Sequence, residues 1–527
     1  MRSHVSAGRP RSAPARRPLL LVPLLVVSLT LAAPEAPAQE ADVAGGPYDR
    51  LVIRGATLID GTGSPPVGPV DIVVEEGRIA DVRRVTALDL ARGTERATGD
   101  RVIDAEGKWV MPGIIDAHTH VGHGDELPRE YIPRLWLGHG VTTVRTFVSE
   151  ETDPAVQLSR AQEAGERTAA PRIRLSRFWR GDDPRLWSPE GARQVVREWK
   201  EQGYEGVKVS GKPGLLPDVL RAIAEETEEQ GMGLAVHIGQ DGVVPMDAVA
   251  VASAGASTIE HHYGYAESTF EDRTVQDLVA DYDYGDELDR FRATARVWDE
   301  AEMDRLHGAV TDTLLALSRE GRYTMVPTFS VYEDQTDLAR ARNLPWMEDY
   351  AHPSLLEGWT PSRETHGSFY FEWTSRDEAA WGRMFLEWLP WVNEFKNRGG
   401  RVAVGSDAGT FYHLYGFGTI REMELMERAG FHPLEVMRSA TKESARAVGL
   451  AGETGVVRVG YQADLLVLDH NPLDDLKVLY GHGALRTDPD GGARRIHGLR
   501  YTISDGRVFD ARSQLERVRQ MVEEAGR

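Results

Sequence analysis

Short apolar runs and longer stretches of helical spacing alternate along most of this 527-residue chain. Eight of the runs read as strands. They cover residues 113–120, 141–146, 172–176, 206–210, 233–238, 257–261, 324–329 and 401–407. Segments such as 191–202, 216–230 and 303–319 lie between them and carry apolar residues at helical spacing. This eightfold alternation predicts an α/β fold, a (β/α)8 TIM barrel, rather than an open doubly wound sheet.

Further strand-like segments flank the predicted barrel on both sides. They cover 51–60, 70–74, 78–82, 102–104 and 108–110 before it, and 455–460, 463–468, 500–503 and 507–509 after it. We infer that the two groups assemble into one small β-sandwich. The predicted domains are 39–110 and 448–513 for the two parts of the sandwich, 111–447 for the barrel, and 514–527 for a C-terminal helix and tail.

The first 38 residues have the order of a secretory signal. Five arginines precede an apolar run at 19–33, and Ala36-Pro37-Ala38 follows it. We therefore predict a signal peptide over 1–38 and a secreted or periplasmic protein with no membrane attachment after cleavage. The alternative is a membrane anchor, but the run is shorter than the ~20 residues that span a bilayer, and Pro23 interrupts it. Arg16-Arg17 hints at twin-arginine export, although the rest of that motif is poor.

Charge and cysteine content exclude two classes of site. Removal of the five arginines and one glutamate of residues 1–38 changes the formal net charge from -21 to -25. A chain this acidic repels phosphate backbones, so we expect no nucleic-acid partner. There is no cysteine, so any metal must be held by histidine, carboxylate or a modified side chain.

Two connections, 264–323 and 332–400, are too long to be bare loops. They follow the sixth and seventh strands and should lie over the barrel's C-terminal face. They are rich in tryptophan: Trp298, Trp346, Trp359, Trp373, Trp381, Trp388 and Trp391. These side chains either pack the insertions onto the barrel or, in one or two cases, line a pocket for an apolar substrate group.

Candidate chemical residues lie in or at the end of several predicted strands. His118 and His120 end the first strand two positions apart, so both imidazoles project from one face. The others are Lys208, His237, His261 and Asp407, in barrel order. Each alone has an ordinary explanation: a core histidine, a snorkelling lysine or a helix-capping aspartate. Their joint occurrence at the face where barrel active sites lie favours a site.

Five stretches match a known family. They are Gly-Ile-Ile-Asp-Ala-His-Thr-His at 113–120, Ile-Glu-His at 259–261, Gly-Ser-Asp-Ala-Gly at 405–409, and Ala-Thr-Lys-Glu-Ser-Ala-Arg at 440–446 with Ala-Asp-Leu-Leu-Val-Leu-Asp at 463–469. Over about residues 50–510, the chain resembles the amidohydrolase superfamily and, within it, the imidazolonepropionase-like and prolidase-like (Xaa-Pro dipeptidase) branch.

The resemblance implies a binuclear metal centre. His118, His120 and Asp407 would bind one divalent ion, and His237 and His261 the second. Lys208, carboxylated by carbon dioxide, would bridge the two ions, because a carbamate is anionic whereas an ammonium repels cations. Imidazolonepropionases lack this lysine, so it points to the peptidase-like members. Zinc is the default metal for such ligands, although manganese or cobalt would bind them too.

The chain departs from the family at the sixth strand, where the usual Glu-His-Gly is replaced by Glu260-His261-His262-Tyr263. We favour His261 for the family's position. His262 or Tyr263 would then face the substrate, and Arg145 at the end of the second strand is another candidate for substrate binding.

The implied function is an exported hydrolase of amide bonds next to a free carboxylate, with a dipeptide or an N-acyl amino acid as substrate. A hydroxide bridging the metals would attack the carbonyl, with Asp407 as general base and acid. One alternative is a cyclic amide or lactone hydrolase. Another is a catalytically inert periplasmic protein that binds metal or peptide, which the intact Asp407 argues against. Assembly into a homo-oligomer stays open.

Overall fold

The computed structural model describes residues 44–526 except 93, 95, 122–126, 167, 180–182, 240–242, 244, 272–281, 284–285 and 363–370. The predicted signal peptide lies outside these residues. None of the helices in the described part of the chain is both long and apolar enough to cross a membrane.

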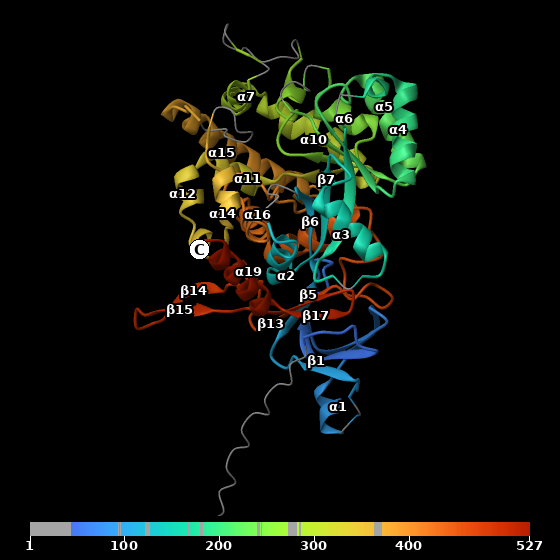
Figure 1. Cartoon of the computed structure of the whole chain (residues 1–527), viewed down its shortest axis with the longest axis vertical. Coiled ribbons are helices and arrows are strands. Elements are labelled where there is room, and N and C mark those ends of the chain that lie inside the picture. The colour runs from blue at the N-terminus through green and yellow to red at the C-terminus, as the bar shows by residue number, and fades with distance from the viewer. Residues whose placement is uncertain are drawn as a thin grey trace, which may run out of the picture. The chain divides into compact units, whose positions relative to one another are not determined.

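Seven parallel strands form the barrel wall (Figure 1). They are β6 (Ile114–Thr119), β7 (Val141–Val148), β8 (Arg172–Trp179), β9 (Gly206–Ser210), β10 (Gly233–His237), β11 (Thr258–Glu260) and β12 (Thr324–Val326). Each pairs in parallel with the next in chain order. The strands are buried on both faces, as a barrel enclosed by helices requires. The predicted α/β barrel is confirmed.

The eighth predicted segment closes the ring through irregular pairing. On one side, Ala403 N donates to the Met325 carbonyl of β12 at 2.9 Å. On the other, Ala117 N donates to Val404 O at 2.9 Å, and Asp407 N donates to His118 O at 2.7 Å. The segment therefore occupies the eighth strand position between β12 and β6, although its hydrogen bonds do not form a regular ladder.

Some of the helices that follow the strands have local start signals. In α4 (Pro189–Glu201), Ser188 accepts a hydrogen bond from Gly191 N, and proline occupies the first position. Its apolar face buries Val195 and Val196. The other helices around the barrel are α2 (Tyr131–Gly138), α3 (Pro154–Glu163), α5 (Pro217–Glu229), α6 (Ala248–Ala254), α10 (Thr311–Arg319) and α16 (Phe417–Arg428).

Both long connections contain helices. After β11 come η2 (Glu267–Thr269), α7 (Glu287–Thr294), α8 (Arg296–Glu300), α9 (Met303–Arg305) and η3 (Leu306–Val310). After β12 come α11 (Phe329–Thr336), α12 (Leu338–Arg342), α13 (Met347–Tyr350), α14 (Pro353–Gly358) and α15 (Ser375–Asn397). Five of the seven tryptophans, Trp298, Trp359, Trp381, Trp388 and Trp391, are buried. The packing interpretation is confirmed for these five.

The strands from both ends of the chain join in a single eight-stranded sheet below the barrel. Its members are β1 (Arg50–Leu58), β2 (Val67–Glu75), β3 (Arg78–Arg84), β4 (Arg101–Asp104), β5 (Trp109–Pro112), β13 (Leu465–Leu468), β16 (Leu499–Ser504) and β17 (Arg507–Asp510). The antiparallel pairing of β13 with β5 connects the two groups. This sheet has its own apolar core, which includes Ile53, Ile72, Leu465 and Ile503.

One predicted strand is wrong. Residues 455–460 form turns, and Gly455 and Gly460 have positive φ angles of 83° and 88°, outside the strand region. A helix expected at 514–524 is present as α19 (Ala511–Ala525). The remaining elements are α1 (Ala87–Ala91), η1 (Pro184–Trp187), α17 (Pro433–Arg438), η4 (Ser439–Glu443), α18 (Ser444–Ala447), η5 (Leu476–Leu479), β14 (Ala484–Thr487) and β15 (Ala493–Ile496).

Candidate metal centre

The side chains predicted to bind the first metal converge on one carboxylate. His118 lies in β6, His120 directly follows it, and Asp407 ends the eighth segment. Nε2 of His118 is 3.3 Å, and Nε2 of His120 3.2 Å, from Asp407 Oδ1. Two histidines from one strand end and an aspartate distant in sequence thus present nitrogen and oxygen atoms to one point.

The predicted second pair lies beside the first group. The ring centroids of His237 and His261 are 4.4 Å apart, and those of His118 and His261 are 4.9 Å apart. His261 Nδ1 is 4.0 Å from Asp407 Oδ2. Ligand atoms of His118, His261 and Asp407 all lie within 4.8 Å of one another, close enough to hold a metal ion.

Two buried nitrogens in this cluster fit a metal site. Among the described residues, Lys208 Nζ has no hydrogen-bond partner, and His118 Nε2 meets only the Asp407 carboxylate, at 3.3 Å. Lys208 is 2% exposed, and its Nζ lies 4.2 Å from the centroid of the Phe147 ring. A buried polar atom left unpaired costs about 1–3 kcal/mol, so such atoms call for an explanation. Coordination would satisfy the imidazole, and carboxylation would turn the amine into a ligand.

Burial keeps the imidazoles in the form that binds metals. It lowers the pKa of His120, and it lowers the pKa values of His237 and His261 well below the usual 6.5. The neighbouring Lys208 charge lowers the pKa of His237 further, and the His237 charge does the same for His261. Neutral imidazole is the metal ligand, so these groups need not lose a proton to bind near neutral pH.

Asp407 and Lys208 differ from these histidines, because their charged forms must be stabilised in a site that is largely removed from water. Burial raises the pKa of Asp407, but the charges and hydrogen bonds of His118 and His120 outweigh it and hold that pKa well below 3.8. Asp407 is therefore an anion. Burial lowers the pKa of Lys208 to about 8, against the opposing effect of the Glu260 and Asp407 charges. A sizeable fraction of this amine is consequently uncharged near neutral pH.

Glu260 is a site residue that the sequence analysis did not single out. Its Oε2 lies 2.5 Å from His118 Nδ1, and its Oε1 accepts from Arg145 Nη2 at 2.9 Å. Burial raises its pKa, but the charges of Arg145, His118 and Lys208 lower it to about 2. A carboxylate on the far ring nitrogen of a metal-binding histidine fixes the ring and its tautomer. The sequence did contain a signal for Glu260, because this residue directly precedes His261 in the matching motif.

The three residues expected to face the substrate have different positions. Arg145 is buried, and its Nε and Nη1 donate to the carbonyls of Ala117 and Ala447 at 2.7 and 3.2 Å, in addition to the Glu260 bond. This placement makes Arg145 a support for Glu260. Tyr263 stacks on His237 with ring centroids 5.1 Å apart, next to the cluster.

His262 turns away into the insertions, where its ring meets four aromatic rings. These belong to Tyr263, Tyr332, Trp381 and Trp388, at centroid distances of 4.2 to 5.5 Å. Burial lowers the pKa of His262 to about 3. The side chain is 1% exposed and neutral.

Three residues at the site have left-handed backbone. The φ angles are 70° at His261, 53° at Thr328 and 58° at Asp407. Such conformations cost of order 1–3 kcal/mol for residues other than glycine and cluster at functional sites. Thr328, which follows β12, places its Oγ1 2.7 Å from His261 Nδ1. No sequence pattern pointed to Thr328.

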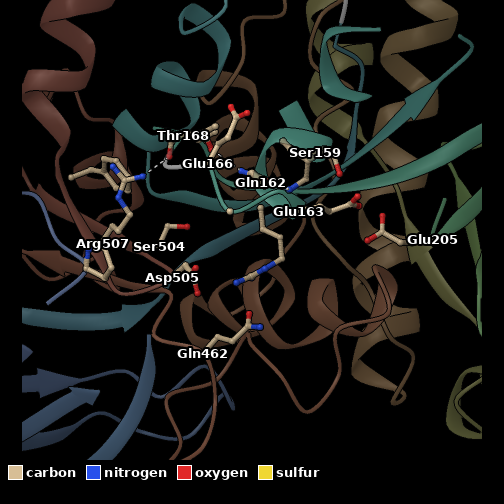
Figure 2. A pocket seen from close by; sticks show the side chains of 16 residues that line it. Ser159, Gln162, Glu163, Glu166, Thr168, Glu205, Gln462, Ser504, Asp505 and Arg507 are labelled. Atoms are coloured by element: carbon tan, nitrogen blue, oxygen red, sulfur yellow. Dashed lines mark hydrogen bonds between the residues drawn. The ribbon is translucent and has the colours of Figure 1, made fainter. Parts of the chain in front are cut away.

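A cavity of about 530 Å³ lies at the other end of the barrel (Figure 2). It is lined by Arg172 at the start of β8, by Glu205 directly before β9, and by the turn between β16 and β17. Two of its charged groups form ion pairs: Arg172 with Asp464 at 2.8 Å, and Glu205 with Arg174 at 2.6 Å. Barrel active sites lie at the opposite face, so we read this cavity as a seam between barrel and terminal sheet.

Comparison with known proteins agrees with this geometry. The amidohydrolase family profile matches residues 109–281 and 390–491, together more than half of the chain. The chain belongs to the amidohydrolase family. The matched ranges include every predicted metal ligand. At the level of this family, the prediction of a hydrolase acting on carbon–nitrogen bonds is confirmed.

The curated relatives differ in how much of each chain they share. Adenine deaminase of Geobacillus kaustophilus is 40% identical over 82 residues, which is 14% of each chain. The chain thus matches only a short part of that enzyme. Imidazolonepropionase of Rhizobium meliloti is 24% identical over 80% of this chain and 91% of its own length. Enamidase of Eubacterium barkeri is 24% identical over 87% and 94%.

Solved structures share the fold over nearly the whole chain. A Xaa-Pro dipeptidase with methionine in its active site has a TM-score of 0.58, 18% identity, and coverage of 88% of this chain and 100% of its own. A prolidase in complex with N-methylphosphonate-L-proline has a TM-score of 0.55, 20% identity and coverage of 88% and 99%. Bottromycin amidohydrolase has a TM-score of 0.59, 20% identity and coverage of 90% of each chain.

Proposed function

We propose that this protein is a metal-dependent amide hydrolase that binds two divalent cations, zinc by default, and cleaves an amide bond next to a free carboxylate. The observation that carries the proposal is the convergence of the predicted ligands at the strand ends, where the buried Lys208 Nζ has no hydrogen-bond partner among the described residues.

The chain's own groups divide into two sets. His118, His120 and Asp407 would hold one cation, and His237 and His261 would hold the other. When bound, the cations would polarise the substrate carbonyl and make a water molecule acidic enough to attack at neutral pH. The carboxylate of Glu260 keeps the His118 ring in place from its far side.

Lys208 would join the two sets as a carbamate. Its buried position and lowered pKa support this role, because carbon dioxide reacts with the uncharged amine and not with the ammonium. The product is an anion between two cationic sites, which removes the charge repulsion that an ammonium would exert on them.

Asp407 would move the proton. Its carboxylate is ionised and 14% exposed, so it can take a proton from the attacking water. Delivery of that proton to the leaving nitrogen then allows the carbon–nitrogen bond to break.

Dipeptides and N-acyl amino acids are the proposed substrates. The methionine and phosphonate-proline ligands of the two prolidase-like structures support an α-carboxylate in the substrate. The second candidate is hydrolysis of a cyclic amide or lactone, favoured by the similarity to imidazolonepropionase over 80% of this chain. The basic and apolar order of residues 1–38 supports a secreted or periplasmic location for either activity.

The test is amine release from a mixed library of dipeptides and N-acyl amino acids by zinc-loaded protein lacking residues 1–38. Asp407→Asn serves as the blank. We expect release from at least one class by the unmutated enzyme only. Hydrolysis confined to cyclic amides or lactones would favour the second candidate. Equal release by the blank would contradict the role of Asp407.

A further inference from the structure

The orientation of His261 depends on a hydroxyl group from the next strand end. Thr328 Oγ1 lies 2.7 Å from His261 Nδ1, and both residues are buried. With Nδ1 engaged in this way, Nε2 is the ring nitrogen left for a metal. Thr328 reaches this position with φ 53° and ψ 46°, which is unfavourable for a β-branched residue. Neighbouring contacts must therefore hold it there.

Thr328 is also the residue that precedes α11, and it does not cap that helix. A threonine in this position ordinarily accepts a hydrogen bond from a backbone N–H of the first turn. Here its side chain makes no capping hydrogen bond, since the hydroxyl lies against His261. The first N–H groups of α11 thus need another acceptor.

Glu422 of α16 supplies that acceptor. Its Oε1 accepts from Phe329 N at 3.0 Å, and its Oε2 accepts from Ser330 N at 2.7 Å. Its carboxyl group is fully buried. Burial raises the pKa of Glu422 to about 8, and the hydrogen bonds from Ser330 N and Phe329 N oppose that shift. Glu422 therefore caps the N-terminus of α11, a role that Thr328 would otherwise have.

We propose that Glu422 is a positioning residue of the metal centre, which caps α11 in place of Thr328 and so frees the Thr328 hydroxyl to orient His261. This inference rests on the proposed function, because it assigns His261 to a metal. If Glu422 were removed, Thr328 would be the nearest alternative cap, and its hydroxyl would be drawn from the imidazole to the helix.

The same two helices offer a matched control. Arg421, next to Glu422, pairs with Glu333 of α11 through two hydrogen bonds of 2.7 Å. This ion pair fixes α11 to α16 but does not touch the first turn of α11. Glu333→Gln should weaken the packing of the helices and leave the contact between Thr328 and His261 intact.

The experiment compares zinc dissociation constants, measured by chelator competition, and the visible absorption of the cobalt-loaded protein. In Glu422→Gln, an amide NH₂ faces one of the two backbone N–H groups, so we expect zinc to bind about tenfold more weakly and the cobalt spectrum to change. Glu333→Gln should lower the melting temperature and keep zinc affinity within about twofold. Equal zinc loss in both variants, or none in Glu422→Gln, would overturn the proposal.

A double-mutant cycle tests whether Glu422 acts through Thr328. Thr328→Ala should weaken zinc binding, Thr328→Ser should retain it, and Glu422→Gln should cause no further loss in the Thr328→Ala background. Additive losses would show that Glu422 acts by another route. A wild-type chain that binds no zinc would instead contradict the proposed function, and this inference would fail with it.

Discussion

The two ends of the barrel both hold an arginine–carboxylate pair, yet they differ in the chemistry of the groups around each pair. At the C-terminal end, Arg145 pairs with Glu260 beside the histidine cluster and the buried Lys208 amine, which has no hydrogen-bond partner among the described residues. At the other end, Arg172 pairs with Asp464 and Glu205 with Arg174 at the edge of a cavity of about 530 Å³, whose lining also includes Asp505, with φ 49°.

This contrast shows that a large cavity is not by itself a candidate metal site. The described residues that line the seam cavity include no histidine, whereas imidazole nitrogens and a carboxylate converge at the C-terminal end. Imidazole and carboxylate groups are the protein ligands that a divalent metal such as zinc requires. The contrast therefore supports the proposal that the metal centre lies at the C-terminal end of the barrel.

The largest expected effect separates two aspartates, one at each end of the barrel. Asp407→Asn should lower kcat by about 10³-fold, within the range for loss of a general acid–base group, while the metals stay bound. Asp464→Asn should leave kcat unchanged, because that carboxylate serves Arg172, Thr454 and the Asp505 N–H. Steady-state kinetics with metal analysis of both variants checks this. A similar fall in kcat in both variants would contradict the difference between the two ends of the barrel.

The second largest effect is expected when Arg145, at the C-terminal end of the barrel, is replaced. Arg145→Met leaves the buried Glu260 without its cationic partner, and breaking a buried pair in this way costs about 3–5 kcal/mol. Urea unfolding of the apo-protein measures this loss. A loss below about 1 kcal/mol would mean that water or His118 compensates the Glu260 charge.

Carboxylation of Lys208 predicts a pH dependence. The pKa of this amine is lowered from 10.5 to about 8, so the reactive uncharged fraction rises as pH rises toward 8. At constant dissolved carbon dioxide, the rate of reactivation of metal-free enzyme should rise about tenfold per pH unit below 8 and level off above it. Lys208→Ala should show no dependence on carbon dioxide. A wild-type rate independent of carbon dioxide would contradict the carbamate.

The smallest effect is expected at the seam. Arg172→Gln should cost about 1 kcal/mol, because Asp464 keeps its bonds from Thr454 Oγ1 and the Asp505 N–H at 2.9 and 3.0 Å. Activity should not change. Thermal unfolding and kcat/KM measured on the same preparation would check both statements, and a large loss of kcat/KM would assign a catalytic role to this end.

Sequence patterns predicted the strands that carry the site, because period and apolar content are local properties. They also predicted the position of Asp407, because the C-terminal ends of all the strands in a barrel lie at the same face. The segment 455–460 was misread as a strand, because its valines resemble a strand pattern, whereas the structure has a turn-rich connection with Val457 buried and Val459 exposed.

Thr328 and Glu422, the residues that we propose orient His261, could not be predicted from the sequence for a physical reason. Thr328 acts through a contact with a residue 67 positions away and Glu422 through one 93 positions away, and neither has a local signature. His262 illustrates the same limit: its sequence position next to His261 suggests the substrate side, but the left-handed backbone at His261 turns the chain, and His262 packs among the insertion's aromatic rings.

The central claim is that the C-terminal end of the barrel holds two metal ions joined by a modified Lys208. The most direct measurement is the metal content per chain, by elemental mass spectrometry, of wild-type protein and Lys208→Ala after equilibration with zinc and bicarbonate. The account predicts two ions in the wild type and fewer in the variant. One ion or none in the wild type, or two in both proteins, would contradict it.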